Sequence, residues 1–160
     1  MNEAELKEQL DAAEKNPRLI AAAVSGLPEN VLRFKPAPNK WNILEILGHL
    51  ADIEIVYAHR LRQILADKEP TIAPIDQDAW GRSLGYTEVP APESIAVYGL
   101  IRLHNLRLLR RLKPGDFEKG AFHPELNRKH TVAEILERMV KHGPNHLEQI
   151  EKLKQAAAGK

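Results

Sequence analysis

Two histidines near the C-terminus, His142 and His146, stand four residues apart. On an α-helix with about 3.6 residues per turn such a pair lies on one face, so both imidazoles can bind the same metal ion. The H-E-x-x-H motif uses the same spacing. A third ligand must come from another segment, and His49 is the best candidate because it lies among apolar residues. The spacing therefore predicts a site in which three histidines hold one divalent ion per chain.

Two carboxylates lie near His49 in the sequence and would share its side of a helix. Glu45 precedes it by four residues and Asp52 follows it by three. A carboxylate so placed can orient a ligand imidazole or act as a general base, so both are candidate catalytic residues. The alternative is that both are exposed and solvated, as most carboxylates are.

The residues between the two C-terminal histidines, Gly143 and Pro144, oppose a shared helical face. A proline inside a helix removes the hydrogen bond to Val140 and costs about 3 kcal/mol or more. The glycine adds roughly 1 kcal/mol relative to alanine. Either the helix ends at His142 and the two imidazoles diverge, or the helix continues and something compensates. A metal ion gripped by both histidines would provide such compensation. Sequence physics leaves both possibilities open.

Apolar residues recur at helical spacing in four long segments. The predicted helices are residues 3–25, 42–66, 92–113 and 131–153. A break or kink is expected at Pro17, because Asn16 before it is a good N-cap. Residues 67–90 form a long connection with a short helix around residues 76–80. Residues 116–130 form a second loop, and no segment has the alternation of a strand. The chain is therefore predicted as an all-α four-helix bundle, with residues 1–160 in one domain.

Composition narrows the functional class. A length of 160 residues suits one domain, and a net charge of +1 gives no sign of a nucleic-acid or membrane partner. The absence of cysteine excludes disulfides, thiolate ligands and an internal thiol nucleophile, so any thiol chemistry would use an external thiol. The charged first residues lack a signal-peptide core, and no apolar run approaches about 18 residues. The expected location is the cytoplasm.

The other four histidines have ordinary explanations. His59 is expected to face solvent, and His104 is expected on the surface or hydrogen-bonded in the core. His130, beside the start of the last helix, is expected to be solvated. His123 lies in a predicted loop and is a candidate substrate contact.

Several short motifs occur in the order and spacing of one family. They are residues 19–29, 41–54, 76–80, 123–125, 131–136 and 142–150. In these motifs, which together span roughly residues 17–153, the chain resembles the DinB-like superfamily, and within it the YfiT-like branch of metal-dependent hydrolases. The resemblance implies an antiparallel four-helix bundle whose metal ion is bound by His49, His142 and His146.

The resemblance also implies zinc or nickel as the metal and a homodimer as the assembly. Some relatives transfer low-molecular-weight thiols such as bacillithiol, and others isomerise substrates with mycothiol. Gly143 and Pro144 depart from the family pattern, which more often has a charged or polar residue after the first histidine of the pair. That departure bears on the local geometry and leaves the three ligands in place.

Our leading hypothesis is a metal-dependent hydrolase or thiol-S-transferase acting on a small molecule. Its ion would activate water or an external thiol. The candidate substrate contacts are Arg102, Asn105, Trp80 and His123. One alternative is a metal- or small-ligand-binding bundle without catalysis, such as a stress-related protein. Another is a purely structural helical domain with unrelated histidines.

Overall fold

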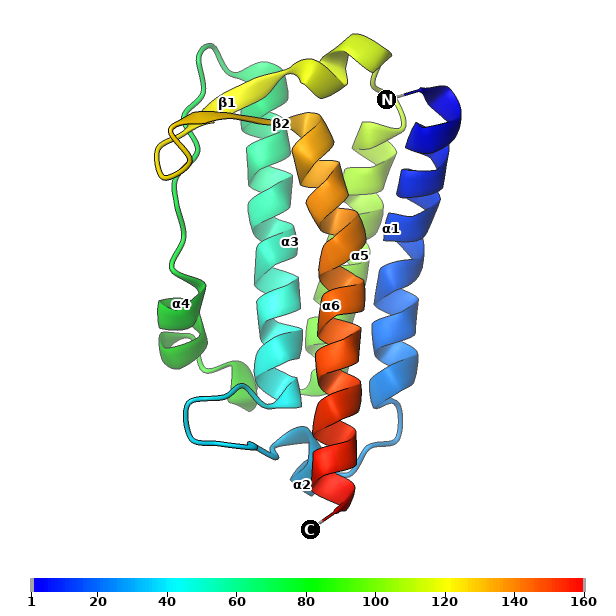
Figure 1. Ribbon diagram of the computed structural model, residues 1–160, viewed down its shortest axis with the longest axis vertical. Helices are drawn as coiled ribbons and strands as arrows, with labels where there is room; N and C mark the ends of the chain where they lie inside the picture. The colour runs from blue at the N-terminus through cyan, green and yellow to red at the C-terminus, as the bar shows by residue number, and fades with distance from the viewer. Residues whose placement is uncertain (1, 160) are drawn as a thin grey trace.

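The computed structural model describes residues 2–159, in which four long helices lie side by side (Figure 1). The four are α1 (Glu3–Val24), α3 (Ile43–Ala66), α5 (Ala91–Leu109) and α6 (Val132–Ala158). Two short helices, α2 (Glu29–Leu32) and α4 (Gln77–Ser83), lie in the connections. The predicted four-helix bundle is confirmed, together with the short helix near residues 76–80. No helix within residues 2–159 is long and apolar enough to cross a membrane.

The long connection between α3 and α5 sets the helix directions. Figure 1 shows α3 rising from the lower end, the chain returning past α4 to that end, and α5 rising again. α3 and α5 therefore run in the same direction, and α1 and α6 both run the opposite way. α6 packs against α1 and α3, and α5 packs against the same two helices. The two helices that carry the predicted ligands, α3 and α6, are thus antiparallel neighbours.

A small hairpin covers the upper end of the bundle. Its strands β1 (Gly120–His123) and β2 (Arg128–Thr131) pair in antiparallel fashion, after a 3-10 turn at Pro114–Glu118. The prediction of an unstructured loop without strands at residues 116–130 is therefore wrong. Strands of four residues are too short to produce a readable alternation in the sequence. The hairpin leads directly into the N-cap of α6, where Thr131 and Glu134 form the predicted capping box.

Helix α1 continues through Pro17, so the predicted break is wrong. Because proline has no N–H, the carbonyl of Ala13 loses its usual helical partner. Arg102 on α5 replaces that partner, with its Nη1 donating to the Ala13 oxygen at 2.7 Å. A side chain from a neighbouring helix thus satisfies the backbone group that the proline leaves free.

Helix α6 continues through Gly143 and Pro144 by the same means. Asn16 on α1 donates its Nδ2 to the oxygen of Val140 at 3.0 Å, the carbonyl that Pro144 leaves free, and to that of Met139 at 3.1 Å. A Cβ at Gly143 would lie 2.7 Å from the Cβ of Asn16, so only glycine allows this approach. The open question of whether the helix ends at His142 is therefore answered by a helix–helix contact.

Polar side chains form a layer between two apolar clusters. The upper cluster includes Leu10, Ile53, Leu106 and Met139, and the lower one includes Ile20, Leu47, Tyr98 and Ile150. On each long helix, polar residues lie between or close to the ends of the parts that contribute to the two clusters. They are Asn16 on α1, His49 and Glu54 on α3, Arg102 and Asn105 on α5, and His142 and His146 on α6.

Candidate metal centre

The three histidines predicted from spacing converge in this layer. Nε2 of His142 lies 3.1 Å from Nε2 of His49 and 3.1 Å from Nε2 of His146. One ligating atom from each ring lies within 4.8 Å of the others. Two nitrogens bound at about 2.0–2.1 Å to a common ion lie roughly 3 Å apart. The spacing of the rings therefore fits a single metal ion.

Hydrogen bonding and burial prepare the rings for ligation. Nδ1 of His146 lies 3.1 Å from Oε1 of Gln149, so we assign the ring proton to Nδ1 and leave the Nε2 lone pair facing the other rings. Burial, and secondarily the charge of His146, lowers the pKa of His49 to about 3 and that of His142 to about 2. Burial also lowers the pKa of His146. All three rings are neutral at pH 7, the state that a metal ion requires.

Aromatic rings and a tyrosine-bound loop surround His49. Its ring centroid lies 4.8 Å from that of Trp41, and Trp41 in turn contacts Gly81 on α4. Next to His49, a Cβ at Gly48 would lie 2.5 Å from the Tyr86 ring, so glycine is needed for this packing. The Tyr86 hydroxyl donates to Oδ2 of Asp52 at 2.7 Å. This hydrogen bond holds the connection between α3 and α5 against α3 beside His49.

Neither predicted catalytic carboxylate bonds to a ligand histidine. Glu45 completes the capping box of α3 by accepting from the backbone N–H of Asn42 at 2.8 Å, and its other oxygen accepts from Lys35 at 2.7 Å. Both its oxygens are thus engaged in local structure. Asp52 is half-buried and accepts the hydrogen bond of Tyr86. The alternative of an exposed, solvated Glu45 is wrong, since Glu45 is buried.

Two predicted substrate contacts, Arg102 and Asn105, lie in a buried network with Glu54. Arg102 Nη2 pairs with Glu54 Oε2 at 2.8 Å, and Asn105 Nδ2 donates to Glu54 Oε1 at 3.1 Å. Both are at most 1% exposed, and their bonds hold α3, α5 and α1 together. A signal for this network was available, because Glu54 occupies the apolar seam of its helix and a buried carboxylate needs a partner.

The remaining candidates lie further up the bundle or on its side. Trp80 is half-buried on α4. His123 belongs to β1 rather than to a loop, and its ring centroid lies 5.9 Å from that of His130. The expected solvation of His130 is wrong, because its side chain is 1% exposed. His59 and His104 are exposed.

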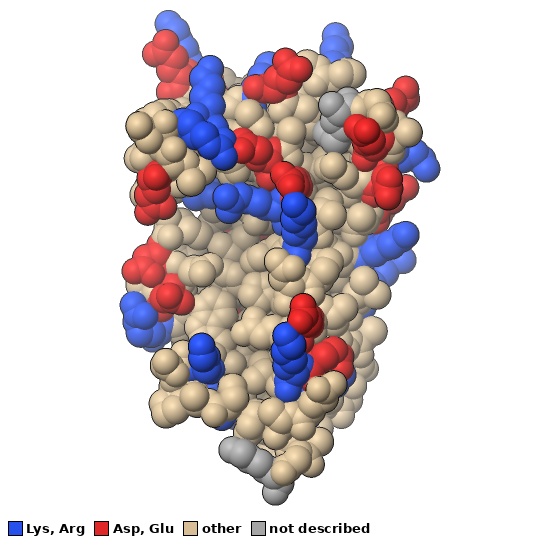
Figure 2. Space-filling view, viewed as in Figure 1, with Lys and Arg blue, Asp and Glu red and all other residues tan. Residues whose placement is uncertain are grey.

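A cavity of about 480 Å³ reaches His142 from the surface between α3 and α6. It is lined by Tyr57, Arg128, Glu134, Glu137, Arg138, Lys141, His142 and Asn145. Figure 2 shows a hollow on this side of the molecule, with Lys and Arg side chains along its upper edge. A volume of this size suits a small molecule. Of the three clustered histidines, His142 therefore borders a space large enough for a small molecule.

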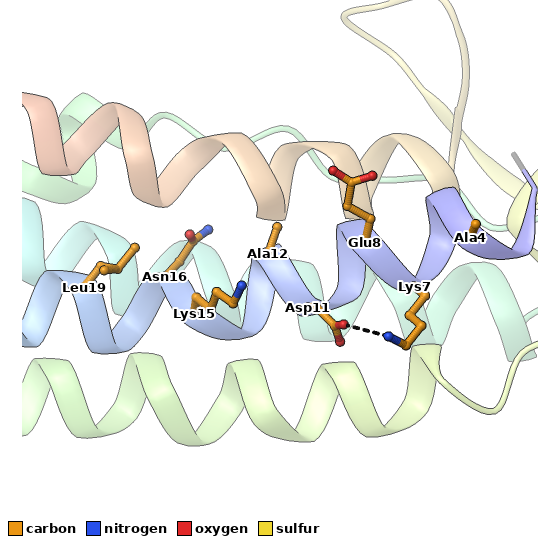
Figure 3. Close-up of a pocket in the computed structure, with 8 residues that line it drawn as sticks. All are labelled: Ala4, Lys7, Glu8, Asp11, Ala12, Lys15, Asn16 and Leu19. Carbon is orange, nitrogen blue, oxygen red and sulfur yellow. Dashed lines mark ion pairs between the residues drawn. The ribbon is translucent and has the colours of Figure 1, made fainter.

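A cavity of about 650 Å³ on the outer side of α1 has a different character. Its lining comes from α1 alone, runs from Ala4 to Leu19 and includes the ion pair of Lys7 with Asp11 at 3.5 Å (Figure 3). None of the three clustered histidines lines it. Figure 3 also shows Asn16 pointing toward α6. Within residues 2–159, this groove offers no comparable cluster of metal-ligating side chains.

The fold and the cluster define a helical bundle with a candidate three-histidine metal centre. The sequence profile of the DinB superfamily matches residues 12–150. The chain belongs to the DinB superfamily.

Individual relatives agree with this assignment. A protein of Oceanobacillus iheyensis is 26% identical over 148 residues, and YfiT of Bacillus subtilis is 26% identical over 151 residues. Each alignment covers 92% of this chain and 85% of the relative, and both relatives are provisionally named as metal-dependent hydrolases. The solved structure of Bacillus subtilis YfiT, described as a four-helix bundle of unusual topology, matches with a TM-score of 0.91 at 22% identity. It covers 99% of this chain and 90% of that one.

Proposed function

We propose that this protein is a divalent-metal enzyme in which His49, His142 and His146 hold one ion beside the cavity. The observation that supports it most is the convergence of three neutral Nε2 atoms on one point, next to a cavity that reaches the surface. Three protein ligands leave a coordination position free, as in catalytic rather than structural sites. Imidazole ligands suit zinc and nickel, which are the metals we expect.

When bound, the ion would act as a Lewis acid that makes water or a thiol nucleophilic near neutral pH. The chain's own residues position and shield this centre. Gln149 fixes the tautomer of His146, and Trp41 packs against His49 and limits the entry of water from that side. Tyr57 lines the cavity beside His142, with ring centroids 6.3 Å apart. Burial and the Glu54 carboxylate raise the pKa of Tyr57 to about 12, so its phenol keeps a proton and can donate to a substrate.

The reaction that we propose is hydrolysis or the transfer of an external low-molecular-weight thiol to an electrophile. A thiol from outside is necessary for the second reaction because the chain has no cysteine. In that reaction the thiol sulfur bonds to the electrophilic carbon, the leaving group departs with its electron pair, and the thiol proton passes to water.

Metal analysis of the purified protein tests the ligand assignment. We expect about one divalent ion per chain in the wild type and none in His49→Ala. His59→Ala is the matched control, because His59 lies on the same helix but is exposed. Unchanged metal content in His49→Ala would refute the ligand set.

Substrate assays then separate the two reactions. A thiol transferase should consume chlorodinitrobenzene only when both metal and a suitable thiol, such as bacillithiol, are present. Turnover of an activated ester without added thiol would instead identify a hydrolase. If the metal-loaded protein does neither with a broad panel of thiols and esters, a non-catalytic binding role becomes the better account.

We also propose a homodimer located in the cytoplasm. Exposed apolar side chains on α5, Val97 at 39% and Leu100 at 68%, are consistent with a dimer contact. Light scattering coupled to size-exclusion chromatography measures the assembly directly.

A further inference from the structure

An arginine without a carboxylate partner stands at the cavity. Arg138 lies one helical turn before His142 on α6, and both residues line the same space. Its two basic neighbours are paired: Lys141 with Glu137, and Arg128 with Glu134 at 2.7 Å. Among residues 2–159, Arg138 itself has no carboxylate within ion-pairing distance. Its charge is therefore available to a ligand in the cavity.

A second arginine, Arg60, adds positive charge from inside the fold. It is 7% exposed, and within the described part of the chain its one hydrogen bond runs from Nη2 to the oxygen of Ala73 at 3.0 Å. A guanidinium has five N–H donors, so burial with a single acceptor is unfavourable. Burial and the charge of Arg138 both lower the pKa of Arg60, and Glu125 is the carboxylate that acts in the opposite direction.

Two buried imidazoles in the hairpin complete this region. His130 is 1% exposed, and neither of its ring nitrogens has a hydrogen-bond partner anywhere in the described chain; Nδ1 of His123 is also unpartnered there. Burial and the charges of Arg138 and Arg60 lower the pKa of both rings, against the opposing carboxylates of Glu134 and Glu125. Both rings are therefore neutral at pH 7 and do not change the charge of this region. With Arg128 and Lys141 already paired, Arg60 and Arg138 face one carboxylate, Glu125, which leaves an excess of about one positive charge.

We infer that the cavity beside His142 binds small molecules that carry a carboxylate, and that Arg138 is the residue that recognises it. This inference rests on the proposed metal centre and specifies its substrate class. One turn of α6, about 5.4 Å, separates Arg138 from His142. A matching ligand has its metal-binding atom and its carboxylate a few bonds apart. The guanidinium of Arg138 is suited to such a group because it forms two parallel hydrogen bonds with a carboxylate. Arg60, which is buried, adds to the positive electrostatic potential near Arg138.

The test uses the cobalt-loaded full-length protein and two matched thiols, 3-mercaptopropionate and its methyl ester. Both offer the same sulfur to the ion, and only the acid carries a negative charge. Their dissociation constants are measured from the near-ultraviolet absorption that develops when a thiol binds cobalt. We expect the acid to bind about tenfold or more tightly than the ester, the size of effect typical of a hydrogen-bonded ion pair. In Arg138→Gln the dissociation constant of the acid should rise by about the same factor, and that of the ester should not change.

Arg18→Gln is the control, because Arg18 is an exposed arginine on the opposite side of the bundle, in the groove between α1 and α5. Equal binding of acid and ester to the wild type, or an unchanged preference in Arg138→Gln, would overturn the inference while leaving the metal centre intact. If neither thiol binds to protein that holds a full complement of cobalt, the open coordination position and this inference fail together. If inorganic phosphate competes with the acid more strongly than propionate does, the assignment to carboxylates is wrong.

Discussion

Two clusters of buried polar side chains lie in the same layer of the bundle, and they differ in how completely their groups are paired. In the cluster of Glu54, Arg102 and Asn105, a charge meets an opposite charge, and the arginine also bonds to a backbone carbonyl. In the cluster of His49, His142 and His146, Nε2 of His142 lies 3.1 Å from Nε2 of each of the other two rings. The first cluster is nearly satisfied from within, whereas the second brings together three nitrogens of the same kind with no opposite charge among them.

This difference separates a structural cluster from a functional one. A buried polar group costs free energy unless it is paired, so a cluster that is paired internally can be explained by folding alone. A cluster of three imidazole nitrogens with no opposite charge between them is better explained by a cation that binds there than by folding alone. The sequence gives both clusters the same appearance of polar residues on apolar helix faces. Their roles can be told apart only by the partners that each atom meets.

The largest expected effect comes from breaking the paired cluster. Arg102→Leu leaves the Glu54 carboxylate buried without its counter-ion, and we expect a loss of about 3–5 kcal/mol in the free energy of unfolding. Urea denaturation measures it. The double variant Glu54→Leu with Arg102→Leu should be less destabilised, because no charge remains unpaired. At a temperature where Arg102→Leu is folded, it should still bind one metal ion. Loss of the metal without loss of stability would place Arg102 in the metal site instead.

The contribution of the histidine cluster to stability should depend on whether a metal ion is bound. A ligand that binds only the folded state stabilises it by about 4 kcal/mol at a concentration 1,000 times its Kd. Adding zinc or nickel to the metal-free wild type should therefore raise its melting temperature, and a chelator should reverse the change. His49→Ala should show no such shift, and His59→Ala should behave like the wild type. An equal shift in all three proteins would show that the metal binds elsewhere.

A smaller loss of stability is expected when the side chain that compensates for a helical proline is removed. Asn16→Ala leaves the Val140 carbonyl buried without a donor, which costs about 1–3 kcal/mol. In a Pro144→Ala background, the N–H restored at position 144 can bond to Val140, so the same Asn16→Ala change should cost less. Chemical denaturation of the four proteins gives the coupling energy. Strictly additive losses would mean that Asn16 does not compensate for the proline.

The long helices were predictable from local signals, whereas the convergence of the three histidines was left open by the Gly143–Pro144 pair and was favoured by the family resemblance. Apolar periodicity located the four helices, a capping box located the start of α6, and i to i+4 spacing placed His142 beside His146. The zinc or nickel, the thiol, the homodimer and the roles of Glu45 and Asp52 remain predictions, because each depends on how this chain meets another molecule.

The features that were missed depend on contacts between residues distant in sequence. Asn16 bonds to Val140 across 124 positions, and no pattern near Pro144 in the sequence predicts that contact. The hairpin consists of strands too short for alternation, and its burial of His130 follows from how it caps the bundle. A break or kink was expected at Pro17 because the sequence near it does not show that Arg102, on another helix, bonds to the carbonyl that the proline leaves free. Sequence patterns predict where a helix is weakened, and tertiary contacts decide whether it breaks.

The smallest expected effect is the pH dependence that a buried imidazole, His130, confers on stability. Burial and the charge of Arg138 lower the pKa of His130 from 6.5 to about 4. Between those two pH values the unfolded chain binds a proton at this position and the native chain does not, so stability falls as the pH falls. From pH 7 to pH 5, His130 should account for about 1–2 kcal/mol of the loss in the metal-free protein. His130→Leu should therefore show a shallower decline in denaturation experiments with a chelator present, whereas exposed His59→Leu should retain the slope of the wild type. A slope that His130→Leu leaves unchanged would mean that the pKa of His130 in the native state lies close to its value in the unfolded chain.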